Sequence, residues 1–171
     1  MSRPLPGGAV TVRIADPAEY AAAGLLTVDA YVAAGVVTVD DPYRAVLADA
    51  PRRAALASLH VAVDADGTLL GTVTTARHGR PYADLARAGE LEVRMLAVAP
   101  AVQRAGVATT LVHACAAVAR AAGDDTLVIS VTSHNANALA FYRRLGFHRQ
   151  QDRDRVLSPA LTLVTLTAPV G

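Results

Sequence analysis

The sequence contains no lysine and no tryptophan, and it has a single cysteine. Its basic residues are therefore all arginines. Without lysine, the chain cannot use a P-loop lysine, a lysine Schiff base or self-acylation on an internal lysine. Cys115 alone can form neither an intramolecular disulfide nor a cysteine-based zinc site, and nothing here indicates an oxidising compartment.

The sequence also has little net charge and no long uncharged run. The 16 basic and 15 acidic residues leave a formal charge of +1, which gives no strong basic field for non-specific nucleic-acid binding. The longest segment without Asp, Glu, Lys or Arg is Val156–Gly171, which contains two prolines and is shorter than the roughly 20 residues of a membrane span. The first ten residues lack the apolar run of a signal peptide. We therefore expect a cytoplasmic protein with no nucleic-acid and no membrane partner.

The apolar content is sufficient for one buried core. With 171 residues, 53% of them hydrophobic, the chain has the size of one domain, which we expect to span residues 1–171. An Asp-Gly turn at residues 64–67 predicts a hairpin, and the polar stretch 77–89 predicts a surface loop over a substrate site. The pattern predicts strands at 9–14, 58–63, 68–76, 91–98, 126–131, 147–155 and 161–167, and helices at 18–35, 42–57, 106–122 and 135–145. This order is typical of a single-domain α/β fold.

The connection between the strand at 91–98 and the next helix carries the most specific pattern. Several backbone N–H groups converge where a turn of small residues opens a helix, and such a turn binds phosphate oxygens. Gly106 and Ala108 keep side chains out of the way, and Arg104 adds a permanent positive charge. By spacing alone, an ordinary strand-to-helix turn packed with small residues fits equally well.

The segment Gln103-Arg104-Ala105-Gly106-Val107-Ala108 resembles the Gln/Arg-x-x-Gly-x-Gly/Ala signature of the GNAT superfamily of acyl-CoA-dependent N-acetyltransferases. The preceding Leu-Ala-Val-Ala-Pro resembles the family's fourth strand and its exit, and Asn135 to Phe147 resembles its second conserved segment. The motifs cover about residues 91–147, and the element order matches over nearly the whole chain. The resemblance implies a mixed sheet of about seven strands with the fourth and fifth splayed, flanked by about four helices.

The resemblance also implies a binding site for acetyl-CoA as co-substrate. In the family, the backbone of the fourth strand pairs with the pantetheine arm, and the following turn holds the pyrophosphate. Asn135 would contact the cofactor, and Tyr142 would direct its hydroxyl at the thioester sulfur. Ala108 stands where many members have a second glycine, which is a sterically mild change. The implied cofactor-binding positions are Leu96, Ala97, Val98, Gln103, Arg104, Ala105, Gly106, Val107, Ala108, Thr109 and Asn135.

Acetylation of an amine requires a general base, because a protonated amine cannot attack a carbonyl. Glu92 occupies the place of the catalytic glutamate in many relatives, and strand alternation predicts that it shares a face with Arg94 and Leu96. Glu90 is the alternative base. The relatives that acetylate ribosomal-protein N-termini use a glutamate where this chain has Ser130, which argues against that role.

Charge that develops during the reaction needs two further groups. A backbone N–H of the fourth strand, expected to be that of Val98, can stabilise the carbonyl oxygen. The phenol of Tyr142, with an unperturbed pKa of about 10, can protonate a thiolate whose conjugate acid has a pKa near 8.5. Direct transfer needs no enzyme nucleophile, and Cys115 is expected to be an inert packing residue.

The acceptor is expected to be an amine of a small molecule or of a peptide. Tyr31, Tyr43 and Tyr82 are candidates for its pocket, although packing roles fit them better. The histidines show no ligand spacing, so no metal is expected. Because dimers are frequent among the relatives in this family, the resemblance also implies a homodimer. A sensor that binds acyl-CoA without turnover is the alternative function.

Overall fold

The computed structural model describes residues 8–171. Residues 1–7 lie outside the described residues. They include the start of the expected domain and part of the segment on which the absence of a signal peptide was judged. The helices are α1 (Tyr20–Ala33), α2 (Tyr43–Ala48), α3 (Ala50–Leu56), α4 (Val107–Ala122) and α5 (Ala136–Arg144), with short 3₁₀ turns η1 (Pro17–Glu19), η2 (Pro100–Val102) and η3 (Gln151–Arg153). The strands are β1 (Thr11–Ile14), β2 (Ser58–Val63), β3 (Leu69–Arg77), β4 (Glu90–Val98), β5 (Thr126–Thr132), β6 (His148–Arg149), β7 (Arg155–Ser158) and β8 (Leu161–Pro169).

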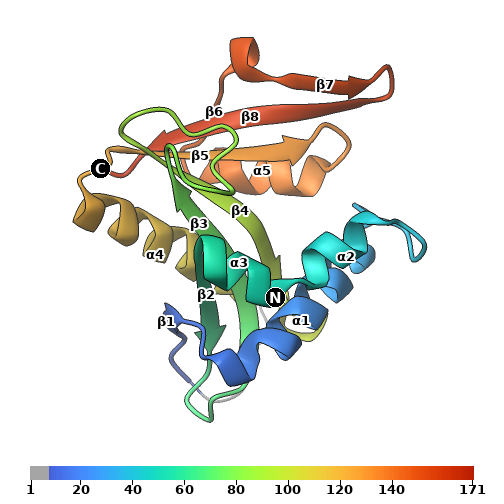
Figure 1. Cartoon of the computed structure of the whole chain (residues 1–171), viewed down its shortest axis with the longest axis vertical. Coiled ribbons are helices and arrows are strands. Elements are labelled where there is room, and N and C mark those ends of the chain that lie inside the picture. The colour runs from blue at the N-terminus through green and yellow to red at the C-terminus, as the bar shows by residue number, and fades with distance from the viewer. Residues whose placement is uncertain (1–7) are drawn as a thin grey trace.

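All eight strands form one mixed sheet, so the predicted α/β fold class is confirmed. The order is β1-β2-β3-β4-β5-β8-β6, with β7 also paired to β8. Among the described strands, β4 and β5 form the one parallel pair, and their pairing is limited to Glu90–Glu92 against Thr126–Val128. Beyond that short stretch the two central strands diverge, as Figure 1 shows near the middle of the molecule.

Helices cover both faces of this sheet. Helix α1 packs on β3 and β4 and α3 on β2, while α4 packs on β3, β4 and β5. The largest core cluster joins α4 residues such as Leu111 and Cys115 to β4, β5 and β8, and it includes Tyr142 of α5. Smaller clusters lie under α1 and α2. Two layers of helices thus enclose the sheet and leave its diverging centre between them.

Two expected elements are each divided in the structure. The helix expected at 42–57 breaks at Asp49, whose ψ of +64° is not helical. The side chain of Asp49 accepts a hydrogen bond from the Arg52 N–H and so caps α3. The strand expected at 147–155 is interrupted by η3, because the buried Thr165 of β8 binds the carbonyl of Arg153 and the carboxylate of Asp154. This second break accounts for eight strands instead of seven.

Strand β4 contains an irregularity that the sequence did not predict. Met95 has a φ of +52°, and the register with β3 shifts between Thr72 and Thr74. After this bulge the side chains change sides: Met95 packs with α1 and α2 residues, whereas Leu96 packs against the cluster that contains Val93. The expectation that Leu96 shares a face with Glu92 and Arg94 was therefore wrong.

In the part of the chain that the structure describes, no helix has both the length and the apolar character needed to cross a membrane.

Candidate functional site

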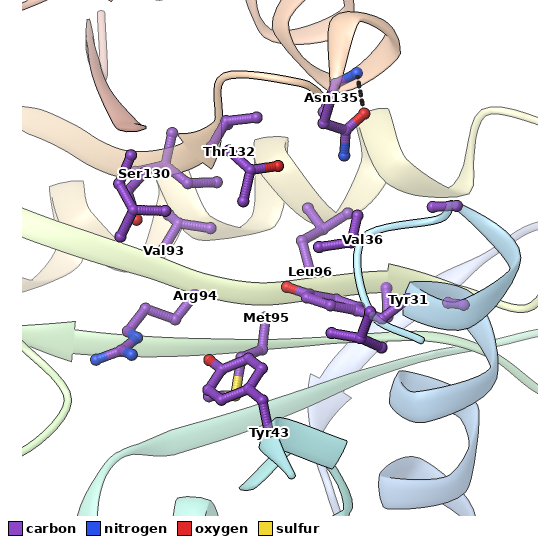
Figure 2. A pocket seen from close by; sticks show the side chains of 18 of the residues that line it. Tyr31, Val36, Tyr43, Val93, Arg94, Met95, Leu96, Ser130, Thr132 and Asn135 are labelled. Carbon is purple, nitrogen blue, oxygen red and sulfur yellow. Dashed lines mark hydrogen bonds between the residues drawn. The ribbon is translucent and has the colours of Figure 1, made fainter. Parts of the chain in front are cut away.

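A cavity of about 610 Å³ opens where β4 and β5 diverge. Figure 2 shows Ser130 and Thr132 of β5 on one side of it and Leu96 of β4 on the other. Its further walls come from α1, the α1–α2 connection, α5 and the β7–β8 hairpin. Among the predicted site residues, Leu96, Ala97, Val98, Gln103, Asn135 and Tyr142 line this cavity.

The start of α4 offers unpaired backbone donors. No side chain caps this helix, so by helix geometry the first N–H groups, those of Val107, Ala108 and Thr109, have no intrahelical acceptor. The N-cap residue Gly106 has a φ of +87°, and an added Cβ would meet nothing within 4 Å. Within the protein itself, glycine is therefore needed here for its backbone conformation. These N–H groups give the predicted phosphate-binding turn its donors.

The edge of β4 that faces the gap also carries unpaired backbone groups. The Ala99 N–H donates to the Leu70 carbonyl on β3 at 2.9 Å. Because successive N–H groups of an extended strand point to opposite sides, the Val98 N–H points away from β3 and towards the gap. An extended chain in the gap, or a developing oxyanion, could accept a hydrogen bond from it.

Tyr142 lines the cavity and is packed between aromatic neighbours. Its ring packs edge-to-face on Phe141 and Phe147, with centroid distances of 5.0 and 5.2 Å. Its hydroxyl has no hydrogen-bond partner among the described residues, although the residue lines the cavity. Burial raises the pKa of this phenol, so it remains a neutral donor at physiological pH.

Asn135 stands at the N-terminus of α5. Its side-chain oxygen accepts the Ala138 N–H at 3.0 Å, the hydrogen bond drawn in Figure 2. The carboxamide NH₂ has no such partner among the described residues and can donate into the cavity.

Glu92 is not among the residues that line the cavity. Its side chain is 2% exposed, and Oε2 accepts the N–H groups of Leu85 and Ala86 at 2.7 and 3.1 Å. Burial raises the pKa of Glu92, and the two backbone hydrogen bonds and Arg94 only partly oppose that rise. Any proton transfer between the cavity and Glu92 therefore has to pass through water.

Glu90 is engaged elsewhere. Both of its oxygens pair with Arg153 at 2.8 Å. Burial by itself would raise the pKa of Glu90, but the hydrogen bonds from Arg153 and from the Arg87 N–H bring it below its usual value. A carboxylate bound in this way is a poor proton acceptor, which makes Glu90 the weaker of the two candidate bases.

Several cavity residues were not identified from the sequence, and others had been given packing roles. Tyr31 and Tyr43 do line the cavity, and both rings project towards β4 in Figure 2. Arg94 lines it as well, pairs with Asp84 at 2.7 Å and lies over the Tyr82 ring. Asp41 and the hairpin residues Arg155, Leu157, Leu161 and Leu163 complete the outer wall. No local sequence signal marks these positions, because only the packing of distant segments brings them to one cavity.

Among residues 8–171, no group of three or more His, Cys, Asp or Glu side chains is placed to hold a metal ion.

Comparison with known proteins gives one family and many related structures. The family described as "Acetyltransferase (GNAT) family" matches residues 27–147. A GCN5-related N-acetyltransferase from Kribbella flavida is 24% identical, with a TM-score of 0.68 over 94% of this chain and 97% of that one. No match to the chain was found among curated proteins.

Two of the related structures contain the coenzyme. A candidate acetyltransferase from Salmonella typhimurium, solved with its cofactor acetyl-CoA, is 22% identical, with a TM-score of 0.66 over 96% of this chain and 95% of that one. The PaiA N-acetyltransferase from Thermoplasma acidophilum, in complex with coenzyme A, is 13% identical, with a TM-score of 0.71 over 95% and 99% of the two chains. At these identities the structural matches establish the fold.

Proposed function

Since the chain belongs to the acetyltransferase (GNAT) family, we propose that it transfers the acetyl group of acetyl-CoA to an amine of a small molecule or peptide. The transfer is direct: the amine nitrogen bonds to the carbonyl carbon, the carbon–sulfur bond breaks, and coenzyme A leaves as its thiol. The observation that carries the proposal is the gap between β4 and β5, whose cavity is lined by Tyr142.

The residues around the gap fit acetyl-CoA. The backbone of Leu96, Ala97 and Val98 binds the pantetheine arm as an added strand would be bound. The turn from Gln103 to Thr109 binds the pyrophosphate through the unpaired N–H groups at the start of α4 and the charge of Arg104. The free NH₂ of Asn135 contributes a further donor. When bound, acetyl-CoA supplies the activated acyl group.

Two side chains move protons in this proposal. Glu92 acts as general base through water, with Oε2 fixed by the loop and Oε1 available as acceptor. Its raised pKa makes it a stronger base than an exposed carboxylate. Tyr142 donates its phenolic proton to the leaving sulfur, and the Val98 N–H stabilises the carbonyl oxygen.

Two measurements test the proposal. Calorimetric titration with acetyl-CoA should show binding, and thiol release with acetyl-, propionyl- and succinyl-CoA across a panel of amines should identify an acceptor. Absence of acetyl-CoA binding would overturn the proposal. Binding without thiol release for any amine would favour the sensor that binds acyl-CoA without turnover.

A further inference from the structure

The three charged residues that line the cavity differ in how their charges are balanced. Arg94 pairs with Asp84, and Arg155 is an exposed residue on β7. Asp41 is the only acidic residue among the described lining residues, and within residues 8–171 it forms no salt bridge. The nearby Arg44 donates to the Val39 carbonyl instead. The cavity wall therefore contains one carboxylate that forms no ion pair with a cation of the described chain.

Local structure holds this carboxylate in place. Asp41 ends the α1–α2 connection, its own N–H donates to the Thr38 carbonyl at 3.2 Å, and its Oδ1 accepts the Tyr43 N–H at 2.8 Å. The second oxygen, Oδ2, accepts no hydrogen bond from the described residues. Asp41 is half-buried, so its carboxylate attracts a neighbouring cation more strongly than a carboxylate on an open surface would.

The surrounding wall suits the body of a small amine. The rings of Tyr31 and Tyr43 supply π faces that attract a cation, and Val36, Val37 and Met95 supply apolar surface. A single cavity of about 610 Å³ has to hold both the end of the pantetheine arm and the acceptor, which leaves space for a small molecule or one terminal residue.

We propose that Asp41 is a specificity-determining residue that binds the acceptor as its ammonium ion, the acceptor being a primary amine with an apolar or aromatic body. This inference rests on the proposed acetyl transfer and concerns the acceptor end of the same site. Asp41 binds the protonated amine on entry, and the proton then leaves through water to the general base before attack. Glu92 keeps that role, so the two carboxylates affect different steps.

The test compares two isosteric probes, 2-phenylethylamine and 2-phenylethanol, titrated into the protein loaded with coenzyme A. Wild type should bind the amine at least about tenfold more tightly than the alcohol, because a hydrogen-bonded ion pair contributes roughly that much or more. Asp41→Asn keeps an oxygen to accept the Tyr43 N–H but removes the charge, so it should abolish the preference and leave binding of the alcohol unchanged. Asp40→Asn changes an exposed neighbour outside the cavity and should keep the preference.

The proposal is overturned if the wild type shows no preference for the amine, or if Asp41→Asn retains that preference. Should Asp41→Asn fold poorly, Asp41→Ser supplies a hydroxyl acceptor for the same turn and provides the same comparison. Phenylalanine is titrated in parallel, because its carboxylate could bind an arginine of the cavity wall. If phenylalanine binds Asp41→Asn as tightly as it binds the wild type, Asp41 is not needed for amine binding, and the proposal is wrong. Coenzyme A is added first, so absent coenzyme binding, which overturns the proposed function, is detected before any amine is added. Thiol release measured in parallel on the wild type separates the sensor from the enzyme.

Discussion

Arg153 and Glu92 hold the same residue, Leu85, by its two backbone groups. The Arg153 guanidinium donates to the Leu85 carbonyl at 2.7 Å, and Glu92 accepts the Leu85 N–H at 2.7 Å. Arg153 belongs to η3, the turn between β6 and β7, and Glu92 belongs to β4, so the loop between β3 and β4 is bound to two separate elements. This loop covers Glu92 and fixes which of its oxygens remains available.

Replacing Arg153 should therefore destabilise the protein strongly. Arg153 and Glu90 are 8% and 12% exposed, and losing one partner of a buried pair typically costs about 3–5 kcal/mol. We expect Arg153→Met to lower the free energy of unfolding in urea by about 3 kcal/mol and to speed tryptic cleavage after Arg80 or Arg87. Arg149→Met, which removes a more exposed partner of Asp154, is the matched control and should cost about 1 kcal/mol or less. Equal losses for the two variants would contradict the role of Arg153 as an anchor.

Tyr142→Phe tests the proposed general acid. The variant keeps the edge-to-face packing on Phe141 and Phe147 and removes only the hydroxyl. We expect kcat to fall about 100-fold, as is common for loss of general acid catalysis, while KM for acetyl-CoA changes less than about twofold. Thiol-release kinetics give both constants. Unchanged kcat would exclude Tyr142 as the proton donor.

Glu92→Gln tests the proposed general base through its pH profile. The glutamine oxygen can still accept the N–H groups of Leu85 and Ala86, so the loop should stay in place. In wild type, kcat/KM should fall as the pH drops through the raised pKa of Glu92, because the protonated carboxyl cannot accept a proton. The variant should be about 100-fold slower and should lack this acid limb. An acid limb that persists in Glu92→Gln would assign it to another group.

Gly71 of β3 lies opposite the end of β4, with no room for a side chain. An added Cβ would come 2.8 Å from the Ala97 carbonyl oxygen and 3.1 Å from Leu111. Gly71→Ala should lower the free energy of unfolding by about 1–3 kcal/mol, in the range typical of overpacking. Because Ala97 belongs to the strand that would bind the pantetheine arm, acetyl-CoA affinity measured by calorimetry should also fall. A variant as stable as wild type would show that β4 can shift without cost.

His60 should make stability depend on pH. It is buried, its Nε2 pairs with Thr75 Oγ1 at 3.0 Å, and desolvation lowers its pKa below 6.5. The stabilisation from neutral His60 is therefore complete above the unfolded-state pKa of about 6.5, and it is lost as the pH falls through the folded-state pKa. The free energy of unfolding in urea should decrease from about pH 7.5 to about pH 5, and this decrease should be smaller for His60→Gln than for wild type. The same decrease in both proteins would assign the pH dependence to other groups.

Local pattern was enough to predict most of the elements. Alternation and apolar content located β2, β3, β4, β5 and β8, and glycines at positive φ ended the turn at Gly67 and the helix at Gly123. The turn that begins α4 was recognisable because small residues at fixed spacing specify its backbone geometry. Such signals act over a few residues and can be read from the sequence.

Tertiary packing decided the remaining features. The bulge at Met95, the contacts of Arg153 and the arrival of Asp41 at the cavity depend on residues far apart in the chain. Arg53 is the clearest case: it is completely buried, and it donates to Thr27, Thr74 and the Leu47 carbonyl. Nothing in its helical segment marks it as a core residue, because a buried charge is tolerated only where distant acceptors converge on it. The sequence alone marked the turn that we propose binds a diphosphate, while the packing of α1, α2 and the C-terminal hairpin determined which side chains line the cavity.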